Sequence, residues 1–79
     1  MTPFDPRPHI VSALAQIAPD VDPDDLDADL HDDLGLDSMD LLNLAAAISD
    51  RSGIDIPERD YSKLRTVRQL EVYLADHAP

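Results

Sequence analysis

The sequence contains no cysteine and no tryptophan, and its 79 residues include only two glycines, one phenylalanine and two tyrosines. Without cysteine, neither a disulfide framework nor thiolate ligation of a metal is available. No apolar run approaches the roughly 20 residues that a membrane-spanning helix needs. The first ten residues contain three prolines and no apolar stretch, so we expect no signal peptide and a cytoplasmic protein.

Positive charge is also scarce. Six Lys and Arg stand against 17 Asp and Glu, which gives a net charge of −11, and residues 1–50 hold all of it, with twelve Asp and only Arg7 as a cation. Such a half-molecule repels nucleic acid and anionic membranes and attracts basic protein surfaces. At this length we expect one small domain, residues 1–79, which acts as a monomer and has marginal stability, because such a chain buries only about 60% of its unfolded surface.

The apolar periodicity predicts an all-α fold, namely a small four-helix bundle with three main helices and one short helix. The first helix is expected to begin near Asp5, which can cap it, with Pro6 in the first helical position. It should end near Ala18, before Pro19. Its buried stripe consists of Ile10, Ala13, Leu14 and Ile17.

Three further helices are predicted. The second should span residues 38–52, with Asp37 as N-cap and Gly53 in the left-handed position that ends a helix. A short helix is expected within residues 57–64, and the last helix begins at Thr66, where Thr66 and Gln69 fit a capping box. The apolar face of the last helix consists of Val67, Leu70, Leu74 and Ala78, flanked by Tyr73.

A long acidic loop, residues 19–36, should connect the first two main helices. Leu26, Leu30 and Leu34 recur every four residues, which predicts a loop pinned across the core with a short helical turn near residues 28–34. Alternate aspartates from Asp20 onward resemble the start of a calcium-binding EF-hand loop. However, Asp25 stands where that loop needs Gly, and His31 stands where it needs Glu, so no specific metal site is predicted.

The most informative segment, Asp33 to Met39, reads Asp-Leu-Gly-Leu-Asp-Ser-Met. It places Ser38 at the start of a helix, where free backbone N–H groups and the helix dipole favour a phosphate ester. Asp37 can act as the cap, which leaves the Ser38 hydroxyl to point outward. Ser38 lacks the Gly-x-Ser-x-Gly setting of a hydrolase nucleophile, and the three histidines fit no triad pattern. We therefore predict no catalytic residue and no enzymatic activity.

The pattern around Ser38 resembles the attachment motif of acyl carrier proteins, in which the serine of an Asp-Ser-Leu run carries the prosthetic group. Met39 stands where Leu is usual. The resemblance extends over residues 8–77 and includes Thr66-Val67 at the start of the last helix. The matching positions upstream and downstream are Leu30, Asp32, Asp33, Leu34, Gly35 and the run Gly53-Ile54-Asp55-Ile56-Pro57.

This resemblance implies a phosphoprotein that bears 4′-phosphopantetheine, transferred from coenzyme A to Ser38 by a phosphopantetheinyl transferase, with Asp37 and Met39 beside the attachment point. The terminal thiol of the arm would hold acyl intermediates of fatty-acid, polyketide or related biosynthesis as thioesters. It also implies a groove between helices where an acyl chain lies, lined by Leu42, Ala45, Ala46 and Ile56.

The resemblance further implies docking of acyl-loading and acyl-processing enzymes, through basic surfaces, on the second helix. The matching docking positions are Met39, Asp40, Leu42, Asn43, Ala46 and Asp50. Asn43 replaces a commonly acidic residue, Ala46 is smaller than usual and Ser52 replaces a large apolar residue, which suggests partners other than those of a housekeeping fatty-acid carrier.

Two alternatives remain at this point. One is a peptidyl or aryl carrier of a non-ribosomal peptide system, although Gly35-Leu36-Asp37-Ser38 is closer to the acyl type than to the Gly-Gly-x-Ser run of those carriers. The other is a helical interaction module that kept the bundle and lost the modification.

Overall fold

The computed structural model describes residues 4–78. Its helical elements are α1 (Arg7–Ile17), α2 (Ser38–Ser52), the 3₁₀-helix η1 (Glu58–Lys63) and α3 (Val67–Asp76), and residues 4–78 contain no β-strand. The prediction of an all-α bundle with one short helix and a long loop is confirmed. Within the same residues, no helix has both the length and the apolar character needed to cross a membrane.

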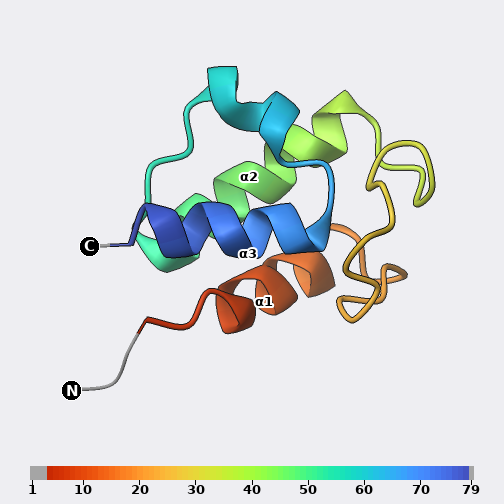
Figure 1. Ribbon diagram of the computed structural model, residues 1–79. Helices are drawn as coiled ribbons and strands as arrows, with labels where there is room; N and C mark the ends of the chain where they lie inside the picture. The colour runs from red at the N-terminus through yellow and green to blue at the C-terminus, as the bar shows by residue number, and fades with distance from the viewer. Residues whose placement is uncertain (1–3, 79) are drawn as a thin grey trace.

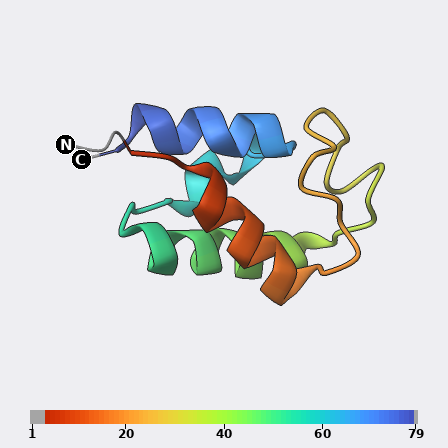
Figure 2. The same ribbon diagram turned by 90° about the horizontal axis from the view of Figure 1, so that it is seen from below.

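The three α-helices pack around one core. α2 and α3 run in the same direction and α1 runs in the opposite direction, crossing both of them (Figures 1 and 2). Nine of the core residues are at most 2% exposed, and no charged or polar side chain is buried in the described chain. The side chains that are buried most completely are Ile10, Leu14, Leu30, Leu44, Ile48, Val67, Leu70 and Leu74.

Two prolines and one aspartate shape the start of α1. Asp5 Oδ1 accepts a hydrogen bond from the backbone N–H of Arg7 at 3.1 Å, but Asp5 is not the N-cap residue, so its predicted role as the cap is wrong. The helix itself begins one residue later than predicted, because Pro6 is the N-cap residue and not the first helical residue. Its C-cap is Ala18, directly before Pro19, as predicted.

The acidic loop lies at the end of the bundle where α2 and α3 begin (Figures 1 and 2). Leu30 is fully buried, while Leu26 and Leu34 pack against the core and remain partly exposed. The backbone N–H groups of Asp33 and Leu34 both donate to the carbonyl of Asp29, at 2.9 and 3.0 Å, which forms the predicted helical turn. The loop is therefore ordered by its leucines, as the spacing indicated.

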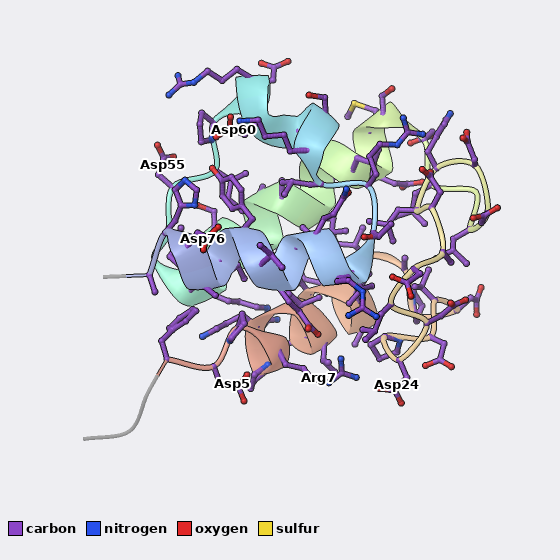
Figure 3. The ribbon with its side chains drawn as sticks, viewed as in Figure 1. Asp5, Arg7, Asp24, Asp55, Asp60 and Asp76 are labelled. Carbon is purple, nitrogen blue, oxygen red and sulfur yellow. The ribbon has the colours of Figure 1, made fainter. Side chains whose placement is uncertain are left out.

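Three arginines also hold this loop. Arg7 pairs with Asp24, and Figure 3 shows the two side chains side by side below the bundle. Arg65 contacts Asp29 at 2.8 Å, and Arg68 contacts Asp27 at 2.7 Å. These arginines come from α1 and from the start of α3, so charge pairs tie the loop to both helices.

The start of α3 differs in detail from a capping box. Thr66 Oγ1 accepts from the backbone N–H of Gln69 at 3.1 Å, as predicted. Gln69 Oε1, however, accepts from the backbone N–H of Arg65 at 2.8 Å, one residue before the N-cap. The reciprocal half of the predicted box is therefore wrong, because the side chain of Gln69 reaches past Thr66 to the preceding residue.

The end of α3 and one of its faces also depart from the prediction. α3 ends at Asp76, so Ala78 lies beyond the helix. Ala78 precedes Pro79, and a residue before proline avoids the α conformation.

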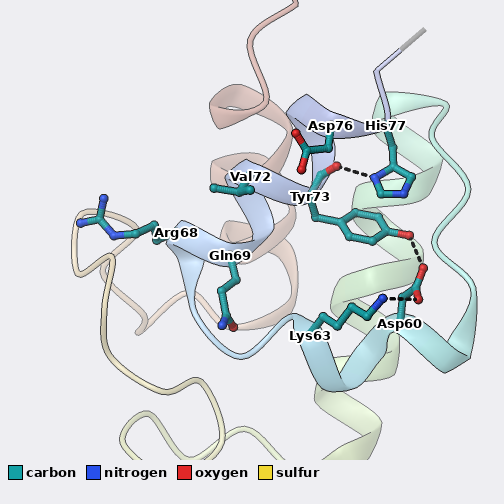
Figure 4. Close-up of a pocket in the computed structure, with 8 residues that line it drawn as sticks. All are labelled: Asp60, Lys63, Arg68, Gln69, Val72, Tyr73, Asp76 and His77. Atoms are coloured by element: carbon teal, nitrogen blue, oxygen red, sulfur yellow. Dashed lines mark hydrogen bonds and ion pairs between the residues drawn. The ribbon is translucent and has the colours of Figure 1, made fainter.

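Tyr73, predicted at the flank, is only 7% exposed and belongs to the core. Its hydroxyl donates to Asp60 Oδ2 at 2.7 Å, and Lys63 Nζ lies 3.4 Å from Asp60 Oδ1 (Figure 4). This chain of contacts fastens η1 to α3.

Candidate functional site

The predicted attachment residue, Ser38, is the first residue of α2, and its side chain is exposed. The cap of α2 comes from its neighbours. Asp37 Oδ1 accepts from the backbone N–H of Asp40 at 2.9 Å, and Asp40 Oδ2 accepts from the backbone N–H of Asp37 at 3.2 Å. Among the hydrogen bonds of residues 4–78, none uses the Ser38 hydroxyl. The hydroxyl is therefore available to a modifying enzyme without loss of the cap.

The chain that leads into α2 is held firmly in place. The backbone N–H of Leu30 donates to the carbonyl of Arg65 at 2.8 Å, and the N–H of Leu36 donates to the carbonyl of Leu30 at 2.9 Å. His31 Nδ1 lies 2.6 Å from the carbonyl oxygen of Leu36. Gly35 has a φ of 76°, a left-handed conformation that glycine adopts most easily. The backbone thus turns sharply just before Ser38, while Leu30 and Leu36 anchor it in the core.

Negative charge dominates the surroundings of Ser38, and Arg65 offsets part of it. The Arg65 guanidinium contacts Asp29 Oδ2 at 2.8 Å and Asp32 Oδ2 at 3.2 Å. A hydrogen bond from the backbone N–H of Asp32, followed by the bond from Arg65, lowers the pKa of Asp29 below its ordinary value of 3.8. The same pair raises the pKa of Arg65. Both groups are therefore charged at neutral pH, and Arg65 lines the same hollow as Ser38.

A hollow of about 240 Å³ opens next to Ser38. Leu41 and Leu64 give it apolar walls, while Arg65 and His31 add groups that bind anions when charged. Its lining is completed by Tyr61 and Ser62. The sequence does not predict that His31, Tyr61, Ser62 and Arg65 are site residues. The last three lie more than 20 positions from Ser38, and only the packing of η1 against α2 brings them to it.

The predicted docking positions form one exposed strip along α2. Met39, Leu42, Asn43, Ala46 and Asp50 recur at three- and four-residue intervals and are all exposed, with Met39 at 61% and Leu42 at 38%. Residues at these intervals lie on one helix face. Asp40 differs, because it is half-buried and its carboxylate belongs to the α2 cap. The strip therefore presents apolar and polar groups together beside Ser38.

The groove predicted for an acyl chain is present only in part. An open hollow of about 480 Å³ includes Ala45, Ala46 and Ile56 in its lining, together with the polar Ser49 and Asp50. Leu42, which is exposed, is not among the residues that line it, so the prediction for Leu42 in the groove is wrong.

The acidic loop shows no sign of a metal site. In residues 4–78, no group of three or more His, Asp or Glu side chains is arranged to hold a metal ion. Several loop carboxylates instead accept hydrogen bonds from the loop backbone. Asp22 Oδ1, for example, accepts from the N–H of Asp24 at 2.9 Å, and Asp29 Oδ1 accepts from the N–H of His31 at 2.9 Å.

Ser38 is exposed at the start of α2, and the neighbouring Asp37 and Asp40 cap this helix. In a small acidic helical bundle, this arrangement is typical of a carrier domain. Residues 9–74 match the family described as "Phosphopantetheine attachment site". This chain belongs to that family, whose cofactor is 4′-phosphopantetheine.

Curated relatives agree with this assignment. The chain is 48% identical over 50 residues to an acyl carrier protein of Streptomyces coelicolor, a match that covers 63% of this chain and 54% of the relative. It is 41% identical over 56 residues to an acyl carrier protein of Bdellovibrio bacteriovorus, covering 68% and 72%. With an acyl carrier protein of Zymomonas mobilis the identity is 36% over 59 residues, covering 72% and 76%.

The match to the Streptomyces relative thus spans about half of that protein's length. All three relatives are carriers by name and not enzymes. This agrees with the expectation of a carrier that is not an enzyme.

Proposed function

We propose that this protein is an acyl carrier protein in which Ser38 bears the phosphopantetheine arm. The observation that carries the proposal is the exposed Ser38 hydroxyl at the start of α2. Because Asp37 and Asp40 cap the helix, this hydroxyl forms no hydrogen bond within the described residues. Its oxygen forms the new ester bond to the phosphorus of the pantetheine phosphate of coenzyme A. The bond to the adenosine bisphosphate leaving group breaks, and the transferase accepts the hydroxyl proton.

The residues around Ser38 suit such a group. The exposed N–H groups at the start of α2 and the guanidinium of Arg65 favour a phosphate, and the apolar walls of the adjacent hollow suit the methyl groups of the arm. The lining residues Leu41, Leu64, Arg65 and His31 would hold the first part of the arm. When bound, the arm supplies a terminal thiol that carries an acyl group as a thioester.

Partner enzymes are proposed to dock on the α2 strip through basic surfaces. Asp37, Asp40 and Asp50 belong to or border this strip, and none of them pairs with a cation in the described part of the chain. Their charges therefore remain available to a transferase and to acyl-loading and acyl-processing enzymes. The cargo is proposed to be an intermediate of fatty-acid, polyketide or related biosynthesis.

The remaining features of the proposal concern the whole chain. We expect it to act as a monomeric, cytoplasmic domain of residues 1–79, of which residues 1–3 and 79 lie outside the described structure. The alternative of an unmodified interaction module predicts a native protein without the arm. The alternative of a peptidyl or aryl carrier predicts loading with an amino or aryl acid by an adenylating enzyme.

The test is modification of the purified chain by a broad-specificity phosphopantetheinyl transferase and coenzyme A, followed by intact mass and peptide mapping. The wild-type protein should gain one phosphopantetheine, and Ser38→Ala should gain none while keeping its helical content. Ser62→Ala is the matched control, because Ser62 is an exposed serine that lines the same hollow; it should be modified normally. A wild-type chain left unmodified by two different active transferases, or a Ser38→Ala chain that is still modified, would overturn the proposal.

A further inference from the structure

One side chain, Tyr61 of η1, lines three neighbouring hollows. The first is the hollow of about 240 Å³ beside Ser38, and the last is the open hollow of about 480 Å³ near Ile56. Between them lies a space of about 10 Å³. This middle space shares Leu41 and Leu64 with the first hollow and Ala45 with the last, so the three spaces form a row along α2.

The middle space is narrow and apolar. About 10 Å³ is roughly the room that one water molecule needs, so no alkyl chain fits there in this structure. Apart from Tyr61, its walls are aliphatic and come from α2, from the end of η1 and from α3; they are Leu41, Leu44, Ala45, Leu64 and Leu70. Such walls suit an alkyl group and do not satisfy a polar one.

Packing alone holds the Tyr61 ring in this position. The ring is half-buried and packs against the core, and none of the hydrogen bonds in residues 4–78 uses its hydroxyl. The other tyrosine, Tyr73, is fastened by a 2.7 Å hydrogen bond to Asp60 (Figure 4). Removing the Tyr61 ring would therefore leave an apolar space without breaking a polar contact.

We propose that Tyr61 is a specificity-determining residue that separates the hollow at Ser38 from the interior, so that an alkyl cargo stays at the surface of this carrier. The assignment of a cargo rests on the proposed function. The geometric part of the inference does not depend on that function: truncating Tyr61 widens the apolar middle space and opens it to the two outer hollows, so that it accepts an alkyl or aryl group.

The first test uses the unmodified protein and benzene as the probe, because dry apolar cavities bind benzene. Benzene should shift the methyl resonances of Leu44, Leu64 and Leu70 in Tyr61→Ala and leave the wild type unchanged. Tyr61→Phe is the matched control, since it keeps the ring and removes only the hydroxyl; it should behave as the wild type. If circular dichroism shows that Tyr61→Ala has lost its helices, Tyr61→Val replaces it. A folded truncation variant whose leucine resonances do not respond would overturn the inference.

The second test uses phosphopantetheinylated protein loaded with acetyl or octanoyl groups. In the wild type and in Tyr61→Phe, the two thioester forms should melt at the same temperature, and octanoyl protons should show no nuclear Overhauser effects to Leu44 or Leu70. In Tyr61→Ala, octanoyl should raise the melting temperature by several degrees over acetyl and should show those effects.

Wild-type octanoyl protein that already shows these effects, or that melts higher than its acetyl form, would contradict the inference. Failure of the proposed function has a different signature, namely no mass gain in the transferase reaction. In that case the benzene experiment still decides the role of Tyr61.

Discussion

At the scale of single residues, adjacent side chains at the start of α2 have different roles. Asp37 and Asp40 satisfy each other's backbone N–H groups at 2.9 and 3.2 Å, whereas Ser38 forms no hydrogen bond through its side chain among the described residues. Serine is itself a good helix cap. In this chain the aspartates take that role, which separates the stability of the helix from the chemistry at Ser38.

This separation predicts that two neighbouring substitutions differ in their effect on the free energy of unfolding. Asp37→Ala should lower the free energy of unfolding by about 1 kcal/mol, because it removes the cap of α2. Ser38→Ala should leave that free energy almost unchanged. Urea denaturation followed by circular dichroism measures both, and the slope of the transition should stay constant. Asp37→Asn is the control and should stay close to the wild type, because Asn caps as well as Asp. Equal losses for Asp37→Ala and Ser38→Ala would contradict the division of roles.

At the scale of elements, η1 depends on side-chain contacts for its position. It has no buried residue of its own. The hydrogen bond between Asp60 and Tyr73 fastens it to α3, and the Asp60–Lys63 ion pair lies within η1. Burial in the core, followed by the hydrogen bond to the Asp60 carboxylate, raises the pKa of Tyr73 from 10.0 to about 12. The same hydrogen bond is the main cause that lowers the pKa of Asp60 below 3.8.

Tyr73→Phe should therefore lower the free energy of unfolding at neutral pH by about 1.5 kcal/mol, since a hydrogen bond to a charged acceptor is lost. The contribution of Tyr73 is fully present below pH 10 and disappears as the pH rises toward about 12, because the folded state binds the phenol proton more tightly than the unfolded state. The difference in the free energy of unfolding between the wild type and Tyr73→Phe should therefore decrease between pH 10 and about pH 12. Denaturation curves at several pH values, with a phenolate absorbance titration, provide the measurement.

Tyr61→Phe is the matched control for this prediction, since the chain has only these two tyrosines. It should leave the late phenolate transition in place. A wild-type titration without a phenol near pH 12 would show that the contact between Tyr73 and Asp60 does not persist in solution.

At the scale of the whole molecule, folding neutralises part of the acidic half and leaves another part free. Arg65 and Arg68, from the balanced half of the chain, pair with Asp29 and Asp27 of the acidic loop. The carboxylates of the α2 strip have no such partner in residues 4–78. The loop is also placed where α2 and α3 begin (Figures 1 and 2), and the positive ends of these helix dipoles favour negative charge. The free charge is therefore concentrated beside Ser38.

Electrostatic docking on this surface should weaken as salt rises, because exposed charges are screened. Asp50→Asn should reduce the affinity for the transferase by up to about fivefold, the range of one exposed charge pair. Asp76→Asn at the end of α3 is the matched control, since it changes the net charge by the same amount and lies off the α2 strip; it should bind as the wild type. Binding measured by fluorescence anisotropy over a salt series tests both points. Equal losses in the two variants would show that net charge, and not the α2 strip, guides the encounter.

Local sequence patterns determined most of the secondary structure and the likeness to carrier domains. The bounds of α2 follow directly from Asp37 at one end and Gly53 at the other, because a cap and a left-handed glycine act through backbone hydrogen bonds within a few residues. The exposed position of Ser38 follows from the same cap. The errors in the helix bounds, at Pro6 and at Ala78, concern one or two residues at a helix end, where small differences in backbone geometry decide the boundary.

The tertiary structure alone decided what surrounds Ser38 and which cavities exist. Arg65 and Tyr61 reach the surroundings of Ser38 only because η1 packs against α2, and nothing in the local pattern of either residue indicates that contact. Likewise, Leu44 and Leu64 are buried and Leu41 packs against them in the core, but the width of the space between them depends on the Tyr61 ring, which comes from η1. Periodicity indicates which face of a helix is buried. The volume of the cavities between the helices depends instead on side chains that come together from distant parts of the chain.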